Sequence, residues 1–266
     1  FVSSLAPNVE MSMLYRNYDK NFHSFYGSAL GEGSRNINEE GIYWGIKIKP
    51  HKKVQLSVYY DRFRFPWLRF LVDGPSNGYE FLARANYTFS RQIRLFVQFR
   101  EESKQRNKSN NTSNIDFLVN TLKRNYIINL DYRVPKILSL KSRLQWSTFQ
   151  EGGGPITNGY ALVQDIGFRF RKFTLDFRFS VFDTDGFNNR QYVFEKDVLW
   201  AFSIPAYNGV GFRNHALLRY RVTRKIDIWL RYAQFSFRNQ QTIGSGLEEI
   251  QGSIRSEVKA QMRIKF

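Results

Sequence analysis

The sequence contains no cysteine, which excludes disulfide bonds and thiolate metal sites as a framework for the 266-residue chain. No run of residues approaches the roughly 18 consecutive apolar positions that a membrane-spanning helix requires. Histidine is limited to His23, His51 and His215, and no nucleophile motif accompanies them. We therefore expect no catalytic residues, no metal site and no cofactor, and we predict that the protein is not an enzyme.

Acidic residues are also scarce, with 23 Asp and Glu against 40 Lys and Arg, giving a formal net charge of +17. Aromatic residues are abundant instead: 25 Phe and 15 Tyr favour pleated, half-buried strands. The mean hydropathy of −0.47 is ordinarily typical of a soluble protein. Strands that alternate apolar and polar residues also average to a low value, so this number excludes only helical membrane spanning.

Period-two alternation is the strongest pattern in the sequence. In residues 42–49, isoleucine and tryptophan occupy one face and lysine, tyrosine and glycine the other. Residues 54–61 repeat the pattern after a short turn, which predicts a β-hairpin. Further alternating pairs are 80–89 with 93–100, 126–132 with 140–149, 160–170 with 173–181, and 211–222 with 226–237.

The connections alternate between tight turns and long polar loops, a rhythm typical of outer-membrane barrels. The sequence therefore predicts an all-β fold: an antiparallel transmembrane β-barrel of about 12–14 strands with short periplasmic turns and long outer loops. Residues 191–208 are either an outer excursion or two further short strands. We expect one domain over residues 1–266, and the long loops are residues 19–41, 65–78, 102–121, 150–158 and 238–251.

The end of the chain is a further amphipathic segment that closes on Phe266. Val258, Ala260, Met262 and Ile264 share one face with this phenylalanine. A final strand ending in an aromatic residue resembles the signal that outer-membrane barrels present to their assembly machinery. Phe266 is therefore the predicted assembly signal.

Arginine recurs on the polar faces of the predicted strands, and we call these nine residues the basic ladder. One interpretation is a lumen that attracts anions, because rings of one charge select what passes through a pore. The other is an interior closed by cross-strand pairs between arginine and carboxylates. The members of the basic ladder are Arg84, Arg94, Arg100, Arg143, Arg169, Arg178, Arg219, Arg231 and Arg263.

The loop at residues 65–78 is unusually apolar for a loop between polar strands. It carries Phe65, Trp67 and Phe70 ahead of an Asp-Gly-Pro turn. Exposed apolar clusters of this kind mark contact sites. We expect these three residues to fold inward or to form a partner-binding loop.

Three blocks of the sequence resemble a known family. They are LYRNYDKNFHSFYGSALGEGSRNINEEGIYWG at 14–45, YYDRFRFPWLRFLVDGPSNGY at 59–79 and IGSGLEEIQGSIRSEVKAQMRIKF at 243–266. These blocks resemble the C-terminal β-barrel region of Bacteroidota outer-membrane proteins that contain a competence-type helix-hairpin-helix domain. The resemblance implies that this chain is the barrel part of a longer protein, located in the outer membrane of a Gram-negative bacterium.

The leading functional hypothesis is a non-enzymatic outer-membrane barrel that serves as a channel, or as the membrane anchor or subunit of a cell-envelope complex. Its expected partners are outer-membrane lipid, lipopolysaccharide, the barrel assembly machinery, and other outer-membrane or periplasmic proteins. An alternative is a component that takes up or binds nucleic acid, motivated by the charge of +17 and the family resemblance. A third is a soluble basic β-sandwich, which is the least compatible with so many long alternating segments.

Overall fold

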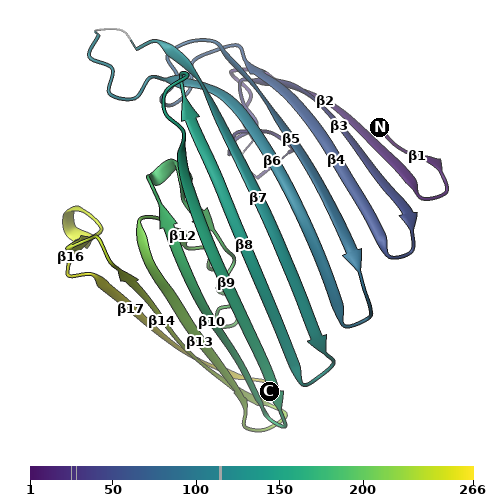
Figure 1. Ribbon diagram of the computed structural model, residues 1–266, viewed down its shortest axis with the longest axis vertical. Helices are drawn as coiled ribbons and strands as arrows, with labels where there is room; N and C mark the ends of the chain where they lie inside the picture. Colours follow the sequence, from purple (N-terminus) through teal and green to yellow (C-terminus); the bar gives the residue numbers. More distant parts are fainter. Residues whose placement is uncertain (25, 28, 114–115) are drawn as a thin grey trace. The chain divides into compact units, whose positions relative to one another are not determined.

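The computed structural model describes residues 1–24, 26–27, 29–113 and 116–266. Parts of two predicted loops, at residues 25, 28 and 114–115, lie outside this description. The main sheet has 13 strands in the order β1-β2-β3-β4-β5-β6-β7-β8-β9-β10-β13-β14-β17 (Figure 1). The predicted antiparallel all-β architecture and the strand number are therefore confirmed.

Twelve of these strands are long, with 10 to 17 residues each, as the alternating pattern predicts. The sequence did not reveal β1, a five-residue strand that pairs with β2. The main-sheet strands are β1 (Val2–Ala6), β2 (Val9–Tyr18), β3 (Glu39–His51), β4 (Val54–Phe65), β5 (Ser76–Thr88), β6 (Ile93–Asn107), β7 (Leu118–Val134), β8 (Leu138–Glu151), β9 (Thr157–Phe170), β10 (Phe173–Thr184), β13 (Val210–Arg221), β14 (Ile226–Phe237) and β17 (Ile254–Ile264).

Short elements lie in the longer connections. Between β10 and β13 the chain forms the 3-10 turn η1 (Phe187–Asn189) and the paired strands β11 (Gln191–Tyr192) and β12 (Ala206–Tyr207). Before β17 it forms β15 (Thr242–Ile243), η2 (Gly246–Glu248) and β16 (Ile250–Gln251). The two short strands proposed within residues 191–208 thus exist, but they pair with each other outside the main sheet.

Two compact units make up the chain, and each is described by itself. Unit 1 comprises residues 1–87, 96–126 and 148–157, and unit 2 comprises residues 88–95, 127–147 and 158–266. In unit 1 the register runs without interruption along most of β2, β3, β4 and β5. In unit 2 it does so along β9, β10, β13, β14 and β17.

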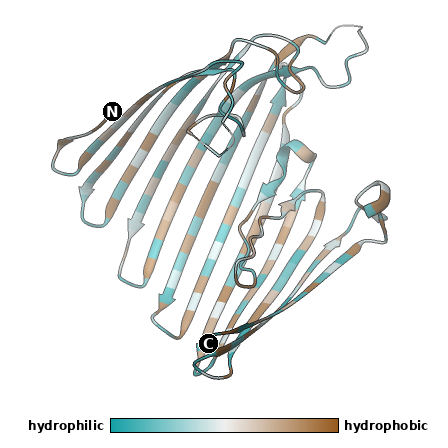
Figure 2. Ribbon diagram, turned by 180° about the vertical axis from the view of Figure 1, so that it is seen from behind, coloured by the Kyte–Doolittle hydropathy of each residue, from teal (hydrophilic) through white to brown (hydrophobic). Residues whose placement is uncertain are grey.

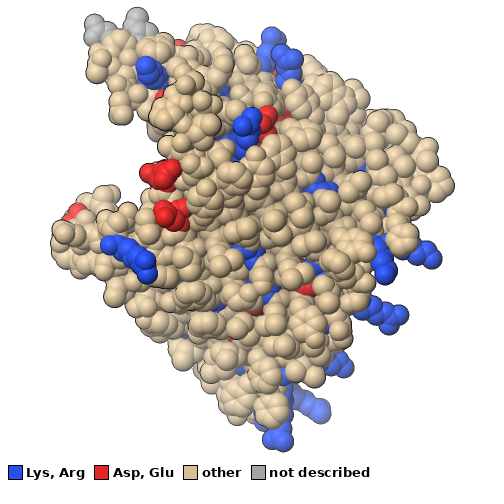
Figure 3. Space-filling view, viewed as in Figure 1, with Lys and Arg blue, Asp and Glu red and all other residues tan. Residues whose placement is uncertain are grey.

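Hairpin turns join the strands at one end and longer loops join them at the other (Figure 1). Arg171 adopts a left-handed φ of 50° in the two-residue turn between β9 and β10. Lys136 does so, at φ 64°, between β7 and β8. The exposed side chains at these turns are largely basic, and Figure 3 shows Lys and Arg at the strand ends beside a broad neutral surface. No helix among the described residues is long and apolar enough to cross a membrane.

Candidate functional site

The strands of unit 2 bury their polar faces and expose their apolar faces. On β10, Arg178 is 4% exposed and Ser180 is fully buried, whereas the alternating Phe177 and Phe179 are about two-fifths exposed. On β14, Arg231 is fully buried while Leu230 is 49% exposed. The banding of hydropathy along the strands is visible in Figure 2. This pattern is the reverse of a water-soluble sheet, in which charged groups are exposed and large apolar groups are buried.

Residues 185–209, which we call the β10–β13 segment, cover the polar face of unit 2. The segment departs from β10 and returns to it, since the Thr184 amide donates to the Gly209 carbonyl at 3.0 Å. Within it, Glu195 and Ser203 form an antiparallel bridge that extends the β11–β12 hairpin. Of the two alternatives for residues 191–208, the structure shows the two short strands, and the segment folds back because its polar side chains find buried partners on the strands.

Glu195 forms the central contact of the β10–β13 segment. It is fully buried and receives two hydrogen bonds from Arg213 of β13, at 2.9 and 2.8 Å. Arg231 of β14 donates a third at 2.8 Å, and the Tyr207 hydroxyl donates a fourth at 3.2 Å. His215 Nδ1 lies 4.0 Å from the same carboxylate. One carboxylate of the segment thus pairs with two buried arginines, and for Arg213 it is the one ion-pair partner within the described residues.

Further contacts extend along the segment. Asp197 accepts a 2.8 Å bond from Lys259 of β17 and lies 3.6 Å from Arg231 Nε. Lys196 pairs with Asp176 of β10, and Gln261 of β17 donates to the Leu199 carbonyl at 3.0 Å. The segment is therefore held to four strands, β10, β13, β14 and β17, by charge-assisted or main-chain hydrogen bonds.

The start and end of the segment are held by packing as well. Gln191 donates to the Ser147 hydroxyl of β8 at 2.6 Å. Tyr207 is fully buried and packs edge-on against Phe235 of β14, with ring centroids 5.9 Å apart. Val193 and Phe182 join the same apolar cluster. Such packing makes the segment an ordered part of unit 2 rather than a loosely attached loop.

The two acidic residues of the segment have perturbed pKa values. Burial raises the pKa of Glu195, but the hydrogen bonds from Arg213 and the nearby positive charges outweigh it and hold the pKa below the ordinary 4.5. For Asp197, burial is likewise outweighed by the hydrogen bond from Lys259, and the pKa falls below 3.8. Both carboxylates are therefore ionised at neutral pH.

We expect the segment to loosen at acid pH. A carboxylate with a lowered native pKa contributes stability above its ordinary value, and that contribution is lost as the pH falls through the native value. The attachment should therefore be constant from pH 7 down to about pH 5 and weaken below pH 4.5, the ordinary value for Glu195. A Phe202→Cys variant with an environment-sensitive dye would report this, because Phe202 is 74% exposed. A signal that stays constant down to pH 3 would contradict the assignment.

Unit 1 contains its own buried charges. Arg16 of β2 is buried and donates to Glu39 of β3 at 2.6 Å and to Asp61 of β4 at 2.8 Å. Glu39 also accepts bonds from the backbone amide of Glu32, which ties the loop after β2 to the strands. The loop residue Glu32 pairs in turn with Lys104 of β6 at 2.7 Å. The polar faces of this unit are thus cross-linked by ion pairs as well.

Five members of the basic ladder form ion pairs with carboxylates. Arg100 contacts Glu80 and Glu102, Arg178 contacts Asp165, Arg219 and Arg263 share Asp227, and Arg231 contacts Glu195 and Glu257. These contacts are the arginine–carboxylate pairs that the second interpretation of the basic ladder expects.

The other four members make different contacts. Arg84 lies over the Phe96 ring at 4.0 Å, and Arg143 donates to Asn129 at 3.1 Å. Arg94 and Arg169 are exposed. Five residues of the basic ladder thus form ion pairs with carboxylates. The role of all nine residues in selecting a solute remains a prediction.

Sequence reasoning missed several of the buried charged residues. Arg213 lies two and six residues before His215 and Arg219 on the same face of β13, so the alternation alone could have identified it. Arg16 likewise lies within a long strand of the main sheet, β2. Glu195 lies in a connection without alternation, and no sequence signal indicated that it would be buried.

The predicted partner-binding loop is divided between buried and exposed residues. Phe65 is 2% exposed and lies beneath the Arg69 guanidinium, 3.5 Å from the ring centroid. Trp67 is half exposed, with its backbone held by Asn38, and Phe70 is 90% exposed. The loop therefore packs partly inward at Phe65 and presents Phe70 outward. The predicted assembly signal, Phe266, is fully exposed after β17.

No cluster of potential metal ligands occurs within the residues that the structure describes. His23 and His51 are exposed, and the buried His215 lies 4.0 Å from Glu195.

No family model and no curated protein matches the sequence. Among solved structures, a KdgM porin in complex with disordered oligogalacturonate is 13% identical, with 86% of this chain and 94% of that chain covered and a TM-score of 0.32. A Pseudomonas aeruginosa FadL homologue is 9% identical, with coverages of 98% and 75% and a TM-score of 0.41. The copper transporter OprC is 7% identical, with coverages of 84% and 40% and a TM-score of 0.44.

Proposed function

We propose that the chain is a non-enzymatic β-barrel of the Gram-negative outer membrane and forms a channel for anionic solutes that the β10–β13 segment narrows. The observation that carries this proposal is the reversed burial of the strand faces. Arg178 and Arg231 are buried while their alternating neighbours Phe177 and Leu230 are exposed. Only a surrounding of lipid outside and polar groups inside satisfies both faces.

The energetic argument depends on the number of exposed apolar residues. Each large apolar side chain transferred from water to an apolar medium gains about 1.5–3 kcal/mol. On β9 and β10 alone, Leu162, Ile166, Leu175, Phe177 and Phe179 are at least two-fifths exposed. A water-soluble β-sandwich would bury these side chains, so the soluble alternative is disfavoured.

The polar interior favours a constricted channel over a wide pore. The β10–β13 segment and the cross-strand ion pairs occupy the polar face of unit 2, yet the exposed Arg94 and Arg169 keep free basic groups on the polar faces. Positive groups along a narrow path would attract anions. The same filled interior also supports the second candidate, a membrane anchor or subunit of an envelope complex, which would conduct no ions.

The same proposal implies which lipids and envelope proteins would contact each part of the chain. The exposed apolar faces would contact lipid, and the basic turns, such as Lys136 and Arg171, would face anionic headgroups. Phe266 would be read by the assembly machinery, and Phe70 would meet lipopolysaccharide or another envelope protein. We further propose that the chain is part of a longer protein, as its resemblance to Bacteroidota outer-membrane proteins with a helix-hairpin-helix domain implies.

Membrane spanning can be tested with adjacent residues on one strand, because the natural chain has no cysteine. Val97→Cys and Leu144→Cys place a thiol on the apolar faces of β6 and β8, and Gln98→Cys and Arg143→Cys place one on the polar faces. Each variant is labelled with bimane in urea and then folded into vesicles of brominated lipid. We expect strong quenching at 97 and 144 and weak quenching at 98 and 143. Equal quenching within both pairs, measured against vesicles without bromine, would refute a transmembrane sheet.

A further inference from the structure

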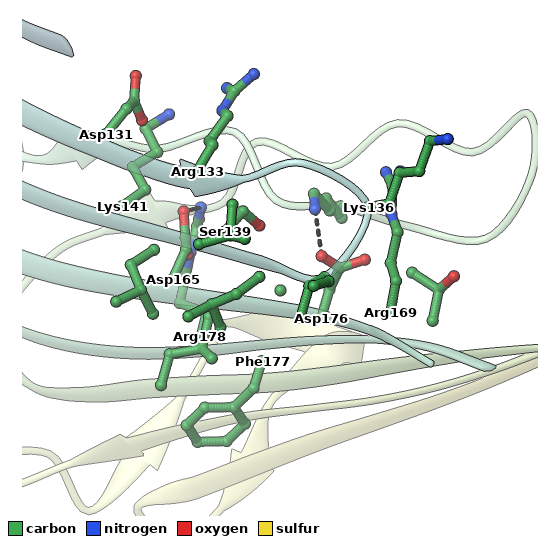
Figure 4. A pocket seen from close by; sticks show the side chains of 18 of the residues that line it. Asp131, Arg133, Lys136, Ser139, Lys141, Asp165, Arg169, Asp176, Phe177 and Arg178 are labelled. Carbon is green, nitrogen blue, oxygen red and sulfur yellow. Dashed lines mark hydrogen bonds and ion pairs between the residues drawn. The ribbon is translucent and has the colours of Figure 1, made fainter. Parts of the chain in front are cut away.

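Unit 2 contains a pocket of 410 Å³ at the end of the sheet where the short turns lie. Its walls come from β7, β8, β9 and β10, with Phe194 and Lys196 of the β10–β13 segment closing one side. The volume lies within the range of small-molecule sites, about 300–1,000 Å³. Figure 4 shows its charged side chains spread along neighbouring strands, with Lys141, Asp165 and Arg178 toward one side of the view and Lys136 and Arg169 toward the other, while the labelled Phe177 points away to the other face of β10.

Positive charge exceeds negative charge in this pocket. Its lining includes the cations Arg133, Lys136, Lys141, Arg169, Arg178 and Lys196 and the carboxylates Asp131, Asp165 and Asp176. Two of the three carboxylates are already engaged: Asp165 binds Arg178 through both oxygens, and Asp176 pairs with Lys196. Only Asp131 remains to balance four further cations.

Those four cations lack counter-ions within the described part of the chain. The side chains of Arg133, Lys136, Lys141 and Arg169 form no ion pair with its carboxylates. Lys141 is only half exposed, and Arg178 beside it is almost fully buried, with Nη1 lacking a hydrogen-bond partner in the described residues. Cations that line one pocket repel one another. An anion that binds among them reduces this repulsion and gains charge-assisted hydrogen bonds.

One wall of the pocket is suited to an organic group. Phe194 is 51% exposed and lines the pocket with Ile137 and Leu138. Its ring is held by a contact with Phe202, with centroids 5.6 Å apart. Binding sites for small molecules combine such apolar walls with a few fixed polar groups. An inorganic anion would leave this wall without a partner.

We propose that this pocket binds a small organic anion, whose carboxylate or phosphate is attracted by the unpaired cations that line it, Lys141 and Arg169 among them, and whose carbon skeleton lies against Phe194. The inference deepens the proposed channel function, because it names the class of solute and a binding station at the short-turn end. Arg178 is already paired with Asp165 through both carboxylate oxygens, so it is not counted among the cations that attract the anion.

The test is calorimetric titration of the detergent-purified full chain with glucose 6-phosphate, gluconate and, as the neutral counterpart, glucose. We expect saturable binding of the two anions, weakened by salt, and none of glucose. Lys141→Gln and Arg169→Gln should each weaken binding by about tenfold or more, since each removes a hydrogen bond to a charged group. The control is Arg171→Gln, which removes an exposed turn arginine that does not line the pocket and should leave binding unchanged.

The outcomes separate this inference from the proposed function. Equal binding of glucose and the anions, no binding of any of them, or equal loss in the Arg171→Gln control would overturn the pocket assignment. Binding of glucose 6-phosphate without binding of gluconate would restrict the site to phosphorylated solutes and would still support the pocket assignment. Because the titration requires no ion flow, it can succeed when bilayer measurements show no current, and the bimane quenching pattern can succeed when the titration fails.

Discussion

Glu195→Gln should increase the unit conductance of the protein in planar bilayers and destabilise the attachment of the β10–β13 segment. The substitution preserves size but removes the charge that neutralises Arg213 and Arg231, both of which are buried. Removing one partner of a buried ion pair costs roughly 3–5 kcal/mol, because the remaining charge is left uncompensated. Asp197 and Glu257 still lie near Arg231, so Arg213 carries most of this cost.

The expected measurement is a several-fold larger single-channel current, with reversal potentials under a salt gradient that keep an anion preference. Glu10→Gln is the matched control, since Glu10 forms an exposed pair with Lys47 and the same chemical change there should leave the current unaltered. If Glu195→Gln fails to fold, Lys259→Gln removes the half-exposed partner of Asp197 and should produce a smaller increase.

Each result distinguishes the two candidate functions, the channel and the membrane anchor. A current that rises when the segment is released, and that loses its anion preference on reversal of Arg94 by an Arg94→Glu change, supports a channel with a basic path. A folded protein that conducts neither before nor after the release of the segment contradicts the channel and supports the membrane anchor.

The strands could be predicted because the pattern that identifies each strand lies within its own residues. Alternation in residues such as Ile42 to Lys49 depends on local sequence, and the pleat converts it directly into two faces. The same alternation placed Arg178, Arg219 and Arg231 on polar faces without any knowledge of the fold. The short strand β1 was missed because Val2–Ala6 is too brief and too mixed to show a period.

The β10–β13 segment could not be predicted because its structure depends on distant residues. Glu195 meets Arg213 and Arg231, which are 18 and 36 residues further along the chain. Lys259 meets Asp197 across a separation of 62 residues. A sequence without alternation gives no indication of which face such a carboxylate will cover, so the positions of the β10–β13 segment and of the pocket emerged only from the structure.

Leu230→Arg should strongly destabilise the protein in lipid vesicles. Leu230 lies near the middle of β14 on the apolar face and is 49% exposed, between the cross-strand neighbours Leu218 and Ala260. An arginine facing lipid near the bilayer midplane costs about 2–4 kcal/mol. If this face met water instead, the same substitution at a half-exposed position would change stability by only about 0.5 kcal/mol in either direction.

The measurement is the free energy of unfolding in urea for protein folded into vesicles, compared with Leu247→Arg as the control. Leu247 is fully exposed in the connection before β17, outside the strands, so its substitution should be nearly neutral in either environment. A large loss for Leu230→Arg alone requires that the exposed apolar face of β14 lies in lipid, and then the buried arginines behind it must face the interior of a membrane-spanning wall. Equal, small effects of the two substitutions would instead mean that water contacts this face, and both the channel and the anchor would have to be abandoned.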